Sequence, residues 1–268
     1  MSLRISPRRV AATIALVALS LGGLHAAGAS TQAPIRPMTP GNPVTTSATE
    51  LYTGVTPCRI VDTRLAGGPL SGIPRNFDVS GNLAGQGGAS TCGIPTYATS
   101  VAVNITGIVE TNGGGYVRGW AAGSTPPTAT LLNYGEEINV SNMVNLPLCR
   151  GGACPDAFTL RNYFANVHVV VDILGYYQTP MFASISTSGT VGDASGLVSA
   201  THPTGGVYNL TFDRPVDSCT ATVTDTDVVT AHVFAVSPIP GQATGLRVYS
   251  KNTANTLTNA PFYVQLSC

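Results

Sequence analysis

The sequence carries very little charge. Lys and Arg number 13, Asp and Glu also number 13, and together they make up 10% of the residues, against about 25% in an ordinary globular domain. Lysine is nearly missing, since Lys251 is its single example. Beyond the first ten positions there is no basic cluster, and both nucleic acids and anionic membranes bind through such clusters. We therefore expect neither as a partner.

Sequence motifs of common enzymes are also missing. The chain has no Gly-x-Ser-x-Gly elbow, His-Glu-x-x-His pair, phosphate-binding loop or dinucleotide fingerprint. It has no Cys-x-x-Cys pair either, which argues against a zinc site. The sequence therefore predicts a protein without a cofactor or metal, and favours a protein that is not an enzyme.

The residues that are abundant indicate strands. The chain contains 33 Thr and 27 Val, which favour strands, and 30 Gly and 19 Pro, which interrupt helices and form turns. A hydrophobic share of 43% is too high for a disordered chain. The composition predicts an all-β protein, and the spacing of its β-rich runs predicts two antiparallel, β-sandwich-like domains.

The first 29 residues have the organisation of a secretory signal peptide. Arg4, Arg8 and Arg9 precede an apolar stretch from Val10 to Leu21, which is too short to span a membrane. Small residues at 27–29 provide a cleavage site. Residues 30–50 are rich in Pro, Thr and Ser and predict an extended linker. We expect a secreted or cell-surface protein without a stable membrane span after cleavage, by either the general secretory or the twin-arginine route.

All six cysteines lie after this leader. An even number of cysteines in an exported chain predicts disulfides, with 15 possible pairings for six. The expected domain layout favours three of these pairs: Cys58–Cys92, Cys149–Cys154 and Cys219–Cys268.

Short β-rich runs separated by turn residues continue to the end of the chain. We expect a main β domain over 51–179 and a smaller one over 181–268, because the pattern restarts near residue 180. The main domain should contain strands at 59–63, 100–106, 116–120, 130–133, 138–141 and 167–174. The second should contain about five, at 206–212, 219–224, 230–236, 246–249 and 261–266.

Several motifs in residues 52–178 occur in a fixed order. They are Pro57-Cys-Arg-Ile-Val-Asp-Thr-Arg64, Cys92-Gly-Ile-Pro95, Val103-Asn-Ile-Thr106 and His168-Val-Val-Val-Asp-Ile-Leu-Gly-Tyr-Tyr177. This order resembles a recurrent domain of exported bacterial proteins, although Tyr177 stands where Phe is common. The tail, with Gly206-Val-Tyr208, Phe212-Asp-Arg214, Cys219, Ala260-Pro-Phe262 and Cys268, is similar to a small C-terminal module of bacterial surface proteins. The resemblance implies an accessory module and no particular activity.

A possible catalytic set is formed by Asp62, Asp172 and His168. If the chain is an enzyme, the two carboxylates would act as acid and base, with His168 nearby. The structural interpretation, which we favour, has Asp62 accepting backbone N–H groups at a turn. In it Arg64 pairs with Asp172 or contacts a carbonyl.

A possible binding surface is formed by Tyr116, Trp120 and Asn133. Aromatic rings stack on sugars, and amides offer both donors and acceptors. Trp120, the single tryptophan, fits an exposed platform and a core residue equally well.

Three functions remain open at this point. The first is a non-catalytic module for adhesion or for binding cell-wall or environmental polysaccharide. The second is a secreted hydrolase of such polysaccharides. The third is a structural surface-layer or filament subunit, since Thr- and Val-rich strands can pair edge to edge in self-association.

Overall fold

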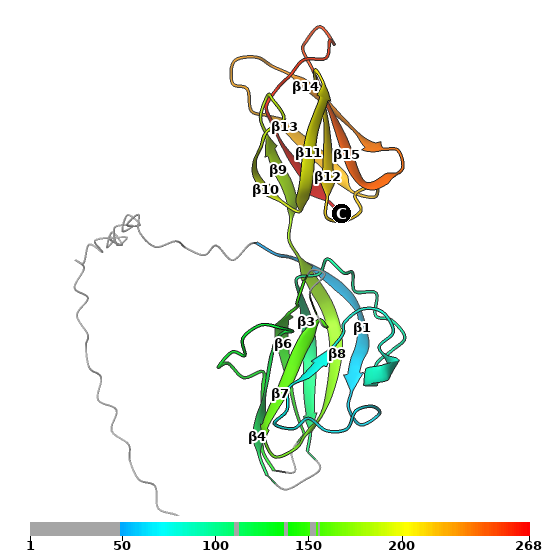
Figure 1. Ribbon diagram of the computed structural model, residues 1–268, viewed down its shortest axis with the longest axis vertical. Helices are drawn as coiled ribbons and strands as arrows, with labels where there is room; N and C mark the ends of the chain where they lie inside the picture. The colour runs from blue at the N-terminus through cyan, green and yellow to red at the C-terminus, as the bar shows by residue number, and fades with distance from the viewer. Residues whose placement is uncertain (1–48, 110–112, 137–138, 151–153, 155) are drawn as a thin grey trace, which may run out of the picture. The chain divides into compact units, whose positions relative to one another are not determined.

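A computed structural model describes residues 49–109, 113–136, 139–150, 154 and 156–268. The expected signal peptide and nearly all of the expected linker lie outside these ranges. The described chain forms sixteen strands and one short 3₁₀-helix, η1 (Ala84–Gln86) (Figure 1). All strand pairings are antiparallel. The prediction of an all-β fold is confirmed.

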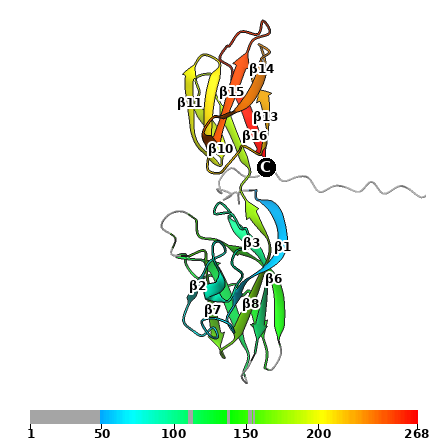
Figure 2. The ribbon, with the colours of Figure 1, turned by 90° about the vertical axis from the view of Figure 1, so that its right-hand side faces the viewer.

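The first eight strands form two four-stranded sheets. One has the order β1-β8-β3-β6 and the other β2-β7-β4-β5. In Figure 2, β2 and β7 lie on one side and β1 and β6 on the other. The bounds of these strands are β1 Leu51–Asp62, β2 Arg75–Phe77, β3 Ser100–Ile108, β4 Gly115–Ala121, β5 Leu132–Tyr134, β6 Val140–Pro147, β7 Phe158–Phe164 and β8 His168–Gln178.

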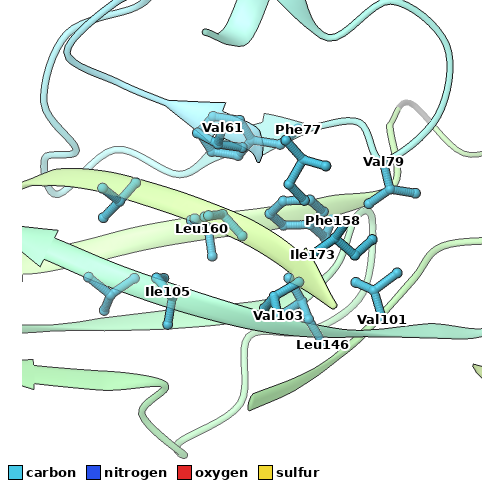
Figure 3. Packing of buried hydrophobic residues seen from close by; sticks show 14 of the residues in the cluster. Val61, Phe77, Val79, Val101, Val103, Ile105, Leu146, Phe158, Leu160 and Ile173 are labelled. Carbon is cyan, nitrogen blue, oxygen red and sulfur yellow. The ribbon is translucent and has the colours of Figure 1, made fainter. Parts of the chain in front are cut away.

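A single hydrophobic core fills the space between these two sheets. Alternate residues of each strand point inward, so that Val101, Val103 and Ile105 of β3 meet Phe158 and Leu160 of β7 (Figure 3). All five are essentially inaccessible to solvent. The inward direction of these residues leaves the other face of each sheet for polar and aromatic side chains.

The remaining eight strands form a second pair of sheets, β10-β9-β16-β13 and β11-β12-β15-β14. They enclose a core of their own, in which Tyr208 and Phe262 are fully buried. The sequence predicted about five strands here, and this was wrong. Strands β10 and β11 are largely exposed and carry little apolar alternation. Strand β9 is short, and its exposed Phe182 hides the alternation of the buried Met181, Ala183 and Ile185. The bounds are β9 Met181–Ile185, β10 Val191–Ser195, β11 Leu197–Thr204, β12 Val207–Phe212, β13 Thr220–Asp225, β14 Val233–Ile239, β15 Gln242–Lys251 and β16 Phe262–Ser267. The division into two domains near residue 180 stays a prediction.

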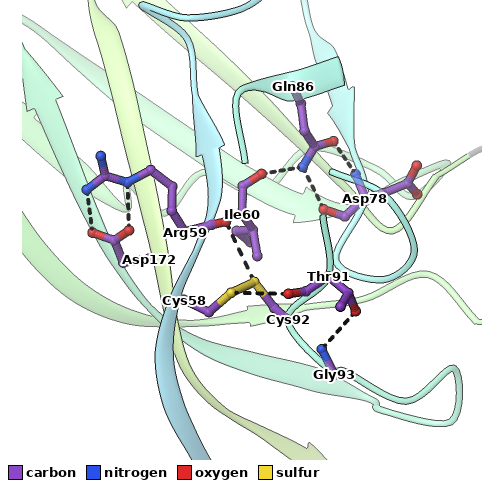
Figure 4. The surroundings of a disulfide bond; sticks show 9 residues. All are labelled: Cys58, Arg59, Ile60, Asp78, Gln86, Thr91, Cys92, Gly93 and Asp172. Atoms are coloured by element: carbon purple, nitrogen blue, oxygen red, sulfur yellow. Dashed lines mark hydrogen bonds and ion pairs between the residues drawn. A yellow bond between two sulfur atoms is a disulfide. The ribbon is translucent and has the colours of Figure 1, made fainter. Parts of the chain in front are cut away.

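The three expected disulfides are all present. Cys58 is bonded to Cys92, Cys149 to Cys154 and Cys219 to Cys268, with Cα–Cα distances of 5.7, 5.7 and 4.2 Å. Figure 4 shows the first of them, which ties β1 to the segment after η1. Gln86 closes the same region, because its Nε2 donates to the carbonyls of Ile60 and Asp78 at 2.8 Å each.

Candidate functional site

Asp62 ends strand β1 in a turn, where several donors surround its carboxylate. The backbone N–H of Arg64 donates to Oδ1 at 3.1 Å, and the Arg64 guanidinium donates to both oxygens at 2.9 and 2.6 Å. Nη1 of Arg59 adds a contact at 3.2 Å. The Asp62 side chain is 1% exposed, so these contacts replace its hydration.

The ion-pair partner of Asp172 on β8 is not the arginine that the sequence suggested. Arg59 holds it through Nε–Oδ1 at 2.9 Å and Nη2–Oδ2 at 3.2 Å (Figure 4). Arg59 and Asp172 lie directly opposite each other in the β1–β8 pair. The suggested Arg64–Asp172 pair is thus corrected: Arg64 pairs with Asp62, two residues away along the chain, and the cross-strand neighbour takes Asp172.

The chemistry of this cluster is that of a structural ion-pair network. Hydrogen bonds from Arg64, opposed in part by burial, hold the pKa of Asp62 below its usual value. A carboxylate kept ionised by two guanidiniums donates no proton at neutral pH. Nδ1 of His168 lies 3.0 Å from Oγ1 of Thr63, which also accepts the backbone N–H of Val169 at 2.9 Å. The three candidates Asp62, Asp172 and His168 therefore lie in one region, in contacts that join β1 to β8.

A different group of side chains gathers on the outward face of the β4–β7 pair. We call it the aromatic–arginine face, and it consists of Tyr116 and Arg118 on β4 and Arg161, Tyr163 and Phe164 on β7. Tyr116 and Tyr163 lie opposite each other and stack, with ring centroids 4.7 Å apart and planes at 16°. The rings of Phe164 and Tyr116 make a T-shaped contact, with their centroids 5.7 Å apart. The rings thus form one continuous aromatic patch.

The two arginines extend this patch along the strands. Arg118 and Arg161 are cross-strand neighbours. Cζ of Arg118 lies 4.8 Å from the ring centroid of Tyr163 and 5.2 Å from that of Tyr116, and Cζ of Arg161 lies 4.7 Å from Tyr163. These are cation–π distances, so the rings hold both guanidiniums in place.

Of the predicted binding residues, the structure brings Tyr116 and Asn133 together. Asn133 on β5 is exposed and lies opposite Tyr116 in the β4–β5 pair. Trp120 follows Tyr116 and Arg118 on the same side of β4 by strand alternation, but it is only 5% exposed. The interpretation of Trp120 as an open platform is therefore corrected, because the ring is covered and has no free face to offer a ligand.

Phe164 is held in an unusual backbone conformation. Its φ is +75°, which is rare for a residue with a side chain and unfavourable for a bulky one. By alternation it would point inward like Phe158 and Leu160, but its ring is instead 80% exposed. Asn162 fixes the following turn, since its Nδ2 donates to the carbonyl of Ala165 at 2.5 Å and Tyr134 donates to its Oδ1 at 2.8 Å. This backbone conformation lowers the stability of the fold, and it places an aromatic ring at the surface.

Strand β7 was not predicted from the sequence, and neither were its residues Arg161, Tyr163 and Phe164 as part of a site. The signal was an alternation from 158 to 163, in which Phe158, Leu160 and Asn162 point inward. Asn162 at an inward position and the charge at 161 hide this pattern, because a buried Asn is not counted as apolar. The buried Asn162 is stable there because Tyr134 and backbone carbonyls satisfy its amide.

A second pair of carboxyl groups was also not predicted from the sequence. Asp78 and Asp156 line a hollow of about 420 Å³ beside the Cys149–Cys154 disulfide. Burial, with the nearby charge of Asp156, raises the pKa of Asp78. A carboxyl group with a raised pKa beside a second carboxyl group is an arrangement used in acid–base catalysis.

Within the described ranges, no group of three or more His, Cys, Asp or Glu side chains is arranged to hold a metal ion. The same part of the chain contains no helix of the length and apolarity needed to cross a membrane. No known protein family matches the sequence, and no curated protein matches it either. The resemblance to exported bacterial modules therefore stays an expectation based on the motifs alone.

Proposed function

We propose that this chain is a secreted or cell-surface, non-catalytic β module that binds polysaccharide through the aromatic–arginine face. The observation that carries the proposal is the gathering of Tyr116, Tyr163 and Phe164 with two arginines on one face of the β4–β7 pair. The chain has few charged residues, and here two arginines lie beside three aromatic rings. Both kinds of side chain recognise sugars. Aromatic rings pack on the C–H faces of pyranoses, and guanidiniums donate to hydroxyl oxygens.

Further support comes from the surroundings of the face. Asn133 is exposed beside Tyr116 and adds an amide that both donates and accepts hydrogen bonds. The stacked rings and strand pairing fix the side chains before a ligand arrives, which lowers the entropy lost on binding. The three disulfides and the signal-like leader support export.

The test is a pull-down of the oxidised protein with insoluble and cell-wall polysaccharides. We expect at least one to retain the wild type, and Tyr116→Ala and Phe164→Ala to lose most of that retention. Tyr263→Ala is the matched control, because Tyr263 is 57% exposed on β16 and belongs to the other pair of sheets. Equal loss in all three variants, or no retention of the wild type by any polysaccharide, would contradict the proposal.

The hydrolase alternative is best tested at Asp78 and Asp156 rather than at Asp62 and Asp172. Only the first pair combines a hollow with a carboxyl group whose pKa is raised. The same incubations should therefore be assayed for released sugar. Release that disappears in Asp78→Asn, while the variant keeps its melting temperature, would support the hydrolase.

A further inference from the structure

We infer that the polysaccharide bound by the aromatic–arginine face is acidic, with carboxylate groups on its sugar rings. This inference rests on the proposed function and adds the chemical class of the ligand. It is carried by Arg118 and Arg161, which lie side by side on β4 and β7 and have no acidic partner among the residues that the structure describes.

The other arginines of the described ranges all have an oxygen acceptor. Arg59, Arg64, Arg150 and Arg214 make ion pairs with aspartates. Arg75 donates to the carbonyls of Gly67 and Gly68, and Arg247 donates to Asn209. Arg118 and Arg161 differ from them, because within these ranges they have no ion pair and their guanidiniums lie over aromatic rings.

The positive charges of Arg118 and Arg161 are not balanced by a nearby acidic side chain among the described residues. Nε of each arginine is buried without a hydrogen-bond partner, whereas their terminal nitrogens are not among the buried atoms that lack a partner. Two like charges that face each other across strands repel. A bound anion would remove this repulsion and accept from the outward guanidinium nitrogens. The site is thus complementary to negative charge.

The rings next to the arginines favour a sugar carboxylate over a phosphodiester chain. In a uronic acid, the carboxylate is attached directly to the pyranose ring. A ring that packs on Phe164 or Tyr116 can therefore place its own or its neighbour's carboxylate over the arginine pair, two residues further along β4. An alditol phosphate polymer carries its charge on an acyclic chain, which offers no ring face to the aromatic side chains.

The experiment compares polygalacturonate with its fully methyl-esterified form, which has the same backbone without the charge. Binding of the full oxidised chain is measured by calorimetry at low ionic strength. We expect the wild type to bind polygalacturonate, and Arg118→Gln/Arg161→Gln to bind it about tenfold more weakly or worse. The matched control is Arg247→Gln/Lys251→Gln, which removes the same charge from β15 and should bind like the wild type.

The outcomes separate this inference from the proposed function. Equal binding of the acidic and esterified polymers, with loss in Tyr116→Ala, would overturn the inference and leave the proposed function standing. Loss in the control double variant as well would show that net charge alone matters and would also overturn it. Tighter binding of poly(glycerol phosphate) or of a DNA oligonucleotide than of polygalacturonate would assign the arginines to another anion. If no polysaccharide binds, both proposals fail.

Discussion

Arg59 and Asp172 form a two-point ion pair across strands β1 and β8, with N–O distances of 2.9 and 3.2 Å. Arg59 also reaches Asp62, so a single guanidinium joins both carboxylates that resembled a catalytic pair in the sequence. The two acids differ in exposure, since the Asp62 side chain is 1% exposed and that of Asp172 is 28% exposed. This difference determines what each contributes to stability.

Asp62→Asn should lower the free energy of unfolding by about 2–3 kcal/mol, because it leaves the donors of Arg59 and Arg64 around a neutral amide. Asp172→Asn is the control and should cost less than about 1 kcal/mol, since its ion pair is partly exposed to water. Urea unfolding measures both values. Equal costs for the two variants would contradict the assignment of Asp62 as the buried centre of the network.

The contribution of Asp62 should depend on pH in a defined direction. Its folded-state pKa lies below the usual value because Arg64 stabilises the charged form. The stabilisation is therefore complete above the unfolded-state pKa of about 3.9 and is lost as the pH falls through the lower folded-state pKa. Unfolding of wild type and Asp62→Asn should thus differ most near neutral pH and converge in strong acid. A constant difference across this range would contradict the lowered pKa.

Removal of the disulfides should reveal a ranking by loop length. The bonds Cys219–Cys268, Cys58–Cys92 and Cys149–Cys154 span sequence separations of 49, 34 and 5 residues. Chain entropy gives about 4 kcal/mol for each of the two long loops and about 2 kcal/mol for the short one. Paired Cys→Ser variants, followed by thermal unfolding, test this. A larger loss for the short loop than for either long one would show that native contacts, rather than chain entropy, dominate.

Phe164→Gly should stabilise the fold relative to Phe164→Ala. Glycine adopts a φ of +75° without strain, whereas alanine retains the penalty of about 1 kcal/mol for a left-handed residue. Both variants lack the ring and should lose polysaccharide binding to the same extent. Melting temperatures and pull-downs are compared for the two. Equal stabilities would mean that the left-handed conformation costs nothing here.

The sequence was informative where burial and alternation coincide. A strand was predicted over 100–106, and Val101, Val103 and Ile105 of this segment line the core. The disulfides followed from chain layout. The features that could not be predicted from the sequence depend on contacts between distant residues. Strand β7 is an example, because its buried Asn162 makes hydrogen bonds with Tyr134 and Leu70, which are distant in sequence. No local sequence pattern predicts such hydrogen-bond partners.

Only part of the candidate site could be predicted from the sequence, because the rest depends on strand pairing. Tyr116 and Asn133 were chosen from their residue types alone, and the β4–β5 register makes them neighbours. Arg161 and Tyr163 lie more than forty residues away along the chain, and only the β4–β7 register brings them beside Tyr116. The exposure of Phe164 goes with a left-handed backbone conformation, which no local sequence pattern predicts.

The pairing of β1 with β8 brings the first and last residues of this group of strands together, with Leu51 opposite Gln178. Entry and exit of the chain therefore lie at adjacent strand ends. A segment with this property can be copied in tandem or inserted into a loop of another protein without disturbing its host. It should also tolerate circular permutation, with a short link from 178 to 51 and new ends in an exposed turn. We therefore expect these eight strands to be portable as a group, because their first and last residues lie opposite each other.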